Sequence, residues 1–254
     1  MMLSIPPDLN YKNFHSHQPG QGPAAIDRVA GTGCTAIDAY ALAGLRALLE
    51  RRAAPTVVVE LPSDRRLASR MLAAGVLQDP RVVTRGRRPS RADRFRGVPI
   101  TRLSTADDVD RFAVDVLAAM RAFAPDLAPK LCASAAEIGE NAVRHGSAPA
   151  LATVEVLPGA VDLVTIDAGV GIRATLDVDP ASDGDALLVA TGTLGGRDGG
   201  LADVARRWSA IDGAQMVLRS GHAGLVLADG TTEYEEFGTP IQGTWALVHV
   251  EKEI

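Results

Sequence analysis

The sequence has few of the features that would place it in a specialised class. No apolar run approaches the roughly 20 residues that a helix needs to span a bilayer. The longest runs, 56–61 and 161–166, have the length of a strand. The first residues lack the basic start and apolar stretch of a signal peptide. We therefore expect a cytoplasmic protein that does not enter a membrane.

Cysteine, lysine and aromatic residues are also scarce. The only cysteines among 254 residues are Cys34 and Cys132, and neither belongs to a C-x-x-C pair. Such isolated cysteines are typical of reduced, partly buried residues rather than of a disulfide or a metal site. The 46% of apolar residues and the net charge of −5 exclude a disordered or collagen-like chain. The length suits one large domain or two small ones.

Charge is divided unevenly between the two halves. Residues 1–100 have a net charge of +7, and the remainder has −12. The positive part includes seven arginines within 81–96, opposed there by Asp93 alone. A nucleic-acid groove would also need aromatic or polar neighbours that read bases, and only Phe95 is near. We favour a solvated linker that docks on the acidic second half, and nucleic acid is not an expected partner.

The first half has an α/β pattern. Residues 1–25 are rich in Pro, Gly, His and Asn, which predicts an irregular arm. Helical spacing over 35–52 is followed by a β-branched strand at 56–61, and then by a helix that Asp64 caps and Gly75 ends. We predict an α/β unit over 26–80 and an arginine-rich linker over 81–100.

The second half, 101–254, has helices followed by strands. Ser104 and Thr105 can cap its first helix, and Gly146 ends its second. This order predicts an α+β sandwich and not a doubly wound nucleotide fold. The expected helices are 107–123, 130–145 and 201–211, and the expected strands are 152–156, 161–166, 214–219, 223–227 and 245–250.

One helix carries residues suited to phosphate chemistry. Glu137 and Asn141 are separated by about 40° on the same helix face, and His145 lies about 40° further round. The amide oxygen of Asn141 is a hard ligand suited to Mg²⁺, and the Glu137 carboxylate can orient a water against a phosphate. This spacing alone is common on any exposed helix face, so it does not decide the function.

Glycine-rich segments follow the helix. The strand 161–166 ends in Asp167-Ala168-Gly169-Val170-Gly171, where a carboxylate can accept from an exocyclic amine such as that of adenine. The glycines let the backbone approach a ligand. A second cluster over 195–201 opens a helix, whose free N–H groups favour phosphate. Gly243-Thr244 precedes the last strand.

Together these motifs resemble the GHKL (Bergerat-fold) ATP-binding domain over roughly 104–250. The order E-x-x-x-N, D-x-G-x-G, a glycine-rich lid and a terminal Gly-Thr is far more specific than any one motif. The run 137–146 is most similar to anti-sigma-factor serine kinases, whose helix ends in a similar N-A-V-x-H-G. The resemblance implies a sandwich with a mixed, mostly antiparallel sheet and helices on one face. It implies ATP and Mg²⁺ as cofactors.

The resemblance also implies a role for each matching residue. Glu137 would polarise the attacking water or hydroxyl, and Asn141 would hold Mg²⁺. Asp167 would bind the adenine amine, and Thr244 would lie near the base through water. His145 would lie near the phosphates, although a helix-ending histidine can equally complement the helix dipole. The remaining residues implied in binding are Gly169, Gly171, Ile172, Arg197, Gly199, Gly200 and Leu201. Arg197 would neutralise phosphate charge or lie exposed in the lid.

The α/β unit over 26–80 is weakly similar to the second half of a STAS domain, the antagonist module that partners these kinases. In those antagonists a phosphorylatable serine follows the aspartate. Here Ala39 follows Asp38, so the resemblance implies a docking or regulatory element and not a substrate. A generic α/β packing unit remains the alternative.

Three functions stay open at this point. The first is an ATP-binding regulator similar to anti-sigma-factor serine/threonine kinases, acting on a sigma-factor or antagonist-type protein. The second is an ATP-gated interaction module with little or no phosphotransfer. The third and weakest is a nucleic-acid-associated ATPase. A homodimer is compatible with each.

Overall fold

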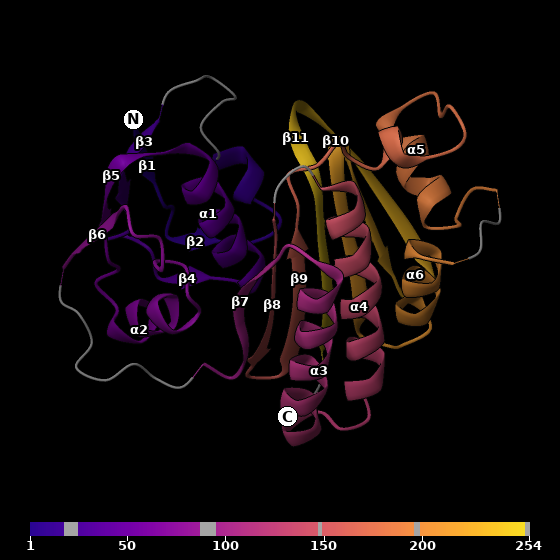
Figure 1. Cartoon of the computed structure of the whole chain (residues 1–254), viewed down its shortest axis with the longest axis horizontal. Coiled ribbons are helices and arrows are strands. Elements are labelled where there is room, and N and C mark those ends of the chain that lie inside the picture. The colour runs from indigo at the N-terminus through magenta and orange to yellow at the C-terminus, as the bar shows by residue number, and fades with distance from the viewer. Residues whose placement is uncertain (18–24, 87–94, 147–148, 196–198, 252–254) are drawn as a thin grey trace. The chain divides into compact units, whose positions relative to one another are not determined.

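A computed structural model describes residues 1–17, 25–86, 95–146, 149–195 and 199–251 (Figure 1). The chain is a mixed α+β protein with parallel and antiparallel sheets. It divides into two compact units, Met1–Phe95 and Arg96–Ile254, which are described separately. The first unit extends at both ends beyond the expected 26–80.

The first unit contains a four-stranded parallel sheet in the order β1-β3-β5-β6. Helix α1 (Ala39–Arg52) connects β3 to β5, and α2 (Arg65–Ala73) connects β5 to β6 (Figure 1). Parallel neighbours require such crossovers, which explains the helix-strand alternation seen in the sequence. The strands are β1 (Met2–Ser4), β3 (Ile26–Ala30), β5 (Ala53–Glu60) and β6 (Val82–Arg85), and the short β2 (Asp8–Leu9) pairs with β4 (Ala36–Ile37).

Aspartates fix the starts of both helices. The carboxylate of Asp38 accepts the N–H of Ala41 and the N–H of Tyr11, both at 2.7 Å. Because β4 occupies 36–37, α1 begins at Ala39 and not at residue 35. Asp64 accepts the N–H groups of the first turn of α2, as its cap position predicts.

Two expectations for this unit were wrong in part, as far as the described residues go. The expected irregular arm supplies β1, and Ile5 continues that pairing by donating its N–H to the Ala30 carbonyl at 2.9 Å. The expected linker supplies β6, whose residues alternate between half-buried and exposed. Both strands are very short, so neither offers the long alternating pattern from which a strand is predicted.

The second unit contains a five-stranded sheet in the order β10-β11-β9-β8-β7, and every pairing is antiparallel. Helices α3 and α4 lie side by side against the sheet (Figure 1). The elements are β7 (Gly97–Leu103), α3 (Ala106–Phe123), α4 (Ala128–His145), β8 (Ala150–Leu157), β9 (Ala160–Ile166), α5 (Asp183–Ala190), α6 (Leu201–Ser209), β10 (Ala214–Ala228) and β11 (Thr231–Glu251).

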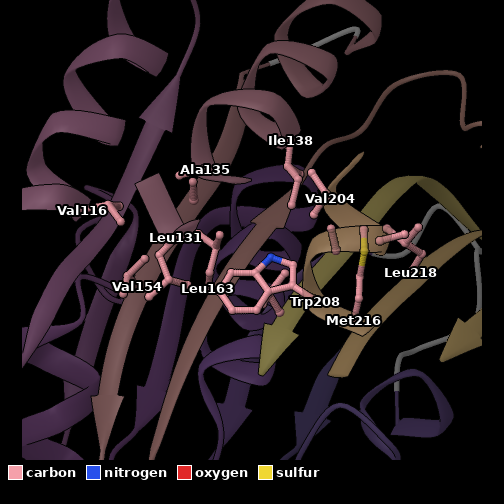
Figure 2. Close-up of a cluster of buried hydrophobic side chains, with 14 of the residues drawn as sticks. Val116, Leu131, Ala135, Ile138, Val154, Leu163, Val204, Trp208, Met216 and Leu218 are labelled. Carbon is pink, nitrogen blue, oxygen red and sulfur yellow. The ribbon is translucent and has the colours of Figure 1, made fainter. Parts of the chain in front are cut away.

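The core of this unit lies between the helices and one face of the sheet. Figure 2 shows the Trp208 indole of α6 among side chains of α4 and the strands. Its Nε1–H donates to Oγ of Ser134 at 2.9 Å, so the buried indole has its partner. This contact fixes α6 against α4. Full burial of a large apolar side chain contributes about 1.5–3 kcal/mol to folding.

The sequence predicted the bounds of α3, α4, β8 and β9 to within two residues. Thr105 and Asp108 form the capping box of α3, and α4 ends at His145 directly before Gly146. Helix α5 and strand β7 were not expected. The strands expected at 214–219 and 223–227 are one strand, β10, and its partner β11 begins at Thr231, well before the expected residue 245.

Candidate functional site

The second unit has a cavity of about 270 Å³ between α4, the end of β9 and the start of α6. Its lining includes residues from all four of the sequence motifs. Ten of the twelve predicted site residues line it: Glu137, Asn141, His145, Asp167, Gly171, Ile172, Gly199, Gly200, Leu201 and Thr244. The other two are Gly169, whose contacts are described below, and Arg197, which lies outside the described residues.

Glu137 and Asn141 contact one another across one turn of α4, where both side chains are half-buried. Nδ2 of Asn141 donates to the backbone carbonyl of Glu137 at 2.9 Å and to its Oε1 at 3.3 Å. Both bonds use the amide nitrogen. The amide oxygen is therefore left to act as a ligand, and the carboxylate is held beside it.

Asp167 follows β9 directly and is 6% exposed. Its Oδ1 accepts the N–H of Gly169 at 2.7 Å, and its own N–H donates to the Thr244 carbonyl at 2.9 Å. The second bond extends the β9–β11 ladder by one residue. The carboxylate is thus fixed by backbone at the floor of the cavity, and a carboxylate has capacity for further donors.

The Gly-Thr motif is a bulge inside β11 and not the start of a strand. The register with β10 jumps between Thr244, opposite Ser220, and Ile241, opposite Gly221. Gly243 lies in this bulge with φ +76°, and a Cβ there would meet the Asp167 carbonyl oxygen at 2.3 Å. Only glycine permits this approach.

Gly169 must be a glycine because of its contacts with the end of α4. A Cβ at this position would lie 2.2 Å from the carbonyl oxygen of His145 and 2.9 Å from Cα of Gly146. The loop after β9 therefore runs directly against the end of α4. The first glycine of the D-x-G-x-G motif joins the two motif segments, and it does not line the cavity wall.

Ser220 links three parts of the site and was missed by sequence reasoning. Its Oγ accepts the N–H of Ile172 at 2.9 Å and donates to the Gly243 carbonyl at 3.1 Å. Gly171, with φ +80°, approaches so closely that a Cβ would be 2.8 Å from this oxygen. A lone serine in a strand gives no signal in the sequence.

The start of α6 lies against the α4 pair. Gly200 is the N-cap with φ 57°, and it has no side chain to satisfy the first N–H groups. A Cβ on Gly200 would be 3.4 Å from Oε1 of Glu137. Glycine thus leaves the helix start open towards the cavity, which favours an anion there.

Arg144 and His145 complete the α4 side. The Arg144 side chain is 66% exposed and lies 3.8 Å from Glu140, and it also lines the cavity. His145 lines the cavity as well, at the last residue of the helix. A basic group here suits a negatively charged ligand.

The strand residues of the cavity floor were also missed. Thr165 and Ala246 both line the cavity. They lie two residues from Asp167 and Thr244 respectively, so they share the same face of the sheet. Because side chains alternate between the two faces of a strand, counting back two residues from Asp167 and forward two from Thr244 would have predicted both.

The structure shows the contacts of some of the seven arginines within 81–96. Arg81 donates to Asp79 and to the carbonyls of Leu49 and Glu50. Arg96 lies over the Phe123 ring at 4.9 Å. The positions 87, 88, 91 and 94 lie outside the part of the chain that the structure describes. Arg81 and Arg96 thus have partners within their own units, and the third described arginine, Arg85, is exposed at the end of β6.

Among the described residues, no helix is both long and apolar enough to cross a membrane. In that same part of the chain, no three or more His, Cys, Asp or Glu side chains gather as a metal site. Comparisons with protein-family models, curated proteins and solved structures found no match to this chain.

Proposed function

We propose that the second unit is an ATP- and Mg²⁺-binding domain of the GHKL (Bergerat) type, similar to anti-sigma-factor serine kinases and acting on a protein partner in the cytoplasm. One observation carries this proposal. Ten residues chosen from four separate sequence motifs lie around one cavity. A chance set of glycines, carboxylates and amides spread over 108 positions would not be expected to converge in this way.

The base would lie on the sheet side of the cavity. Asp167 would accept from the adenine amine, and Thr244 lies next to it through the backbone bond described above. Because Gly243 and Gly171 lack a Cβ, the backbone closes around Asp167 and Ser220 and holds this side of the cavity in place. The volume of about 270 Å³ is close to the lower end of small-molecule pockets.

The phosphates would lie between α4 and the start of α6. Gly199, Gly200 and Leu201 would supply backbone N–H groups, with the helix dipole favouring the negative charge. The donor set fits Mg²⁺, since this ion commonly uses one or two protein oxygens and completes its shell with phosphates and water. Asn141 would supply the protein oxygen. Bound Mg²⁺ and ATP would supply a transferable phosphoryl group with its charge neutralised.

Glu137 would act on the attacking group. Its carboxylate lies beside Asn141 and close to Gly200, where the terminal phosphate would be held. From there it could orient a water or a partner's hydroxyl for in-line attack.

The first unit would serve as the docking or regulatory module. Its parallel sheet with two crossover helices is compatible with the STAS-like interpretation. Asp38 caps α1, and Ala39 is its first residue. Alanine has no hydroxyl to phosphorylate, so the target would be a separate protein.

Titration calorimetry of the purified chain with a non-hydrolysable ATP analogue and Mg²⁺ tests the proposal. We expect one site, and we expect Asp167→Asn to weaken binding by at least about tenfold, the effect of one lost charged hydrogen bond. Asp110→Asn, the same charge change on the exposed face of α3, should bind normally. A folded wild-type protein that binds no nucleotide would overturn the proposal.

A further inference from the structure

Thr165 has a buried hydroxyl on the β9 side of the cavity. The residue is 2% exposed and lines the cavity. Its Oγ1 has no hydrogen-bond partner among the residues that the structure describes. Buried hydroxyls in folded proteins are nearly always paired, so this exception calls for an explanation.

The surroundings of Thr165 favour an apolar residue. Its register partners on the two neighbouring strands are Ala152 on β8 and Ala246 on β11, neither of which has a polar side chain. Val161 and Leu163, on the same face of β9, belong to the apolar core. Valine has nearly the shape of threonine, so it would fill the position without an unpaired hydroxyl. Packing therefore does not account for threonine here.

The position does suit a ligand. Thr165 precedes Asp167 by two residues on one strand face, so their Cα atoms are about 6.6 Å apart along the strand. The flanking Ala246 and, from the helices, Ala142 and Ala190 also line the cavity. Small side chains around a polar pair leave room for a flat ring.

Asp167 and Thr165 offer complementary chemistry. An ionised carboxylate only accepts hydrogen bonds, whereas a hydroxyl can also donate one. In adenine the amine is a donor, and the ring nitrogens to either side of it are acceptors. We propose that the Thr165 hydroxyl donates to a ring nitrogen beside the amine that Asp167 binds, so that Thr165 is a base-contacting residue. This inference rests on the proposed ATP site.

The first test uses Thr165→Val and Thr165→Ser in the full chain. Without nucleotide, Thr165→Val should raise the melting temperature by about 2–4 °C, because the unpaired hydroxyl is gone. The same variant should bind the non-hydrolysable ATP analogue about tenfold more weakly. Thr165→Ser keeps the hydroxyl and should bind as the wild type does.

Thr153→Val is the matched control. Thr153 is a buried threonine of the same sheet whose Oγ1 donates to the Val98 carbonyl at 2.7 Å. Its replacement should lower the melting temperature and leave nucleotide affinity unchanged. A Thr165→Val variant that melts below the wild type would overturn the inference, since its hydroxyl would then have a structural partner.

The second test identifies the contacted atom with the 1-deaza and 7-deaza forms of the ATP analogue. The wild type should lose about tenfold in affinity for one of them, and Thr165→Val should show no such loss. If Thr165→Val binds every analogue as the wild type does, the inference fails while the ATP site stands. If the wild type binds neither the ATP analogue nor its deaza forms, the proposed function itself fails and the inference with it.

Discussion

Gly243 lies so close to Asp167 that a Cβ on the glycine would be 2.3 Å from the aspartate's carbonyl oxygen and 2.6 Å from its Oδ1. The bulge in β11 therefore holds the carboxylate in place from behind. Both residues belong to recognisable motifs, 76 positions apart in the sequence. Their contact gives a steric reason for glycine before Thr244 that is independent of any ligand.

Gly243→Ala should destabilise the protein and displace Asp167. Gly230 has a similar φ of +71° and nothing within 4 Å, so Gly230→Ala is the matched control for backbone strain alone. We expect about 1–2 kcal/mol of destabilisation for the control and about 1–3 kcal/mol more for Gly243→Ala, because a backbone clash must also be relieved. Urea unfolding measures both values. Equal losses would show that the contact with Asp167 is unimportant.

Ser134→Ala should destabilise the packing of α6 on α4. Ser134 Oγ accepts from Trp208 Nε1 and from Arg207, each at 2.9 Å. An indole N–H left buried without a partner costs about 1–3 kcal/mol. The double variant Ser134→Ala/Trp208→Phe should lose less than the sum of the two single variants. Additive losses, measured by urea unfolding, would contradict a direct interaction.

Glu137→Gln separates phosphoryl transfer from nucleotide binding. The amide keeps the size of the side chain but cannot accept a proton at its nitrogen. We expect analogue binding within about twofold of the wild type and a fall in ATP turnover of at least about 100-fold, the usual contribution of a general base. Glu140→Gln, on the same helix but half-exposed, is the control. Unchanged turnover would remove Glu137 from the chemistry, and a wild type that binds without turnover would favour the ATP-gated module.

Lowering the pH should destabilise the first unit, because Asp79 becomes protonated and its ion pair is lost. The Arg81 guanidinium, 2.7 Å away, lowers the pKa of the Asp79 carboxyl from 3.8 to about 2. Because the pKa is lowered by folding, the ion pair stabilises the native state above pH 4, and this contribution is lost as the pH falls towards 2. A shift of this size corresponds to roughly 2 kcal/mol.

Urea midpoints of the wild type and Asp79→Asn between pH 7 and pH 2 test this. Asp79→Asn should be less stable at pH 7, and the difference should close between pH 4 and pH 2. A difference that stays constant with pH would show that the charge of Asp79 does not matter. Asp107→Asn, an exposed carboxylate of α3, is the control and should show no such convergence.

Local signals predicted the elements that have strong periodicity and caps. The cap at Thr105 and the stop at Gly146 marked α3 and α4, and β8 and β9 were found from their apolar runs. The first part of β11, over 231–240, is mostly exposed and rich in Thr and Glu, so it lacks an apolar alternation. Its strand structure comes from pairing with β10. Helix α5 was missed because Gly184 in its first turn weakens the helix signal, although Ser182 caps it.

The sequence by itself determined which chemical groups are present and in what order: a carboxylate and an amide one helical turn apart, an aspartate at a strand end, and clusters of glycine after it. These follow from short-range periodicity and sterics. Only the tertiary structure decided that they surround one cavity, that Gly169 and Gly243 are required by backbone contacts, and that Ser220 and Thr165 belong to the site. Such contacts join residues far apart in the chain, and no local pattern encodes a distance between strands.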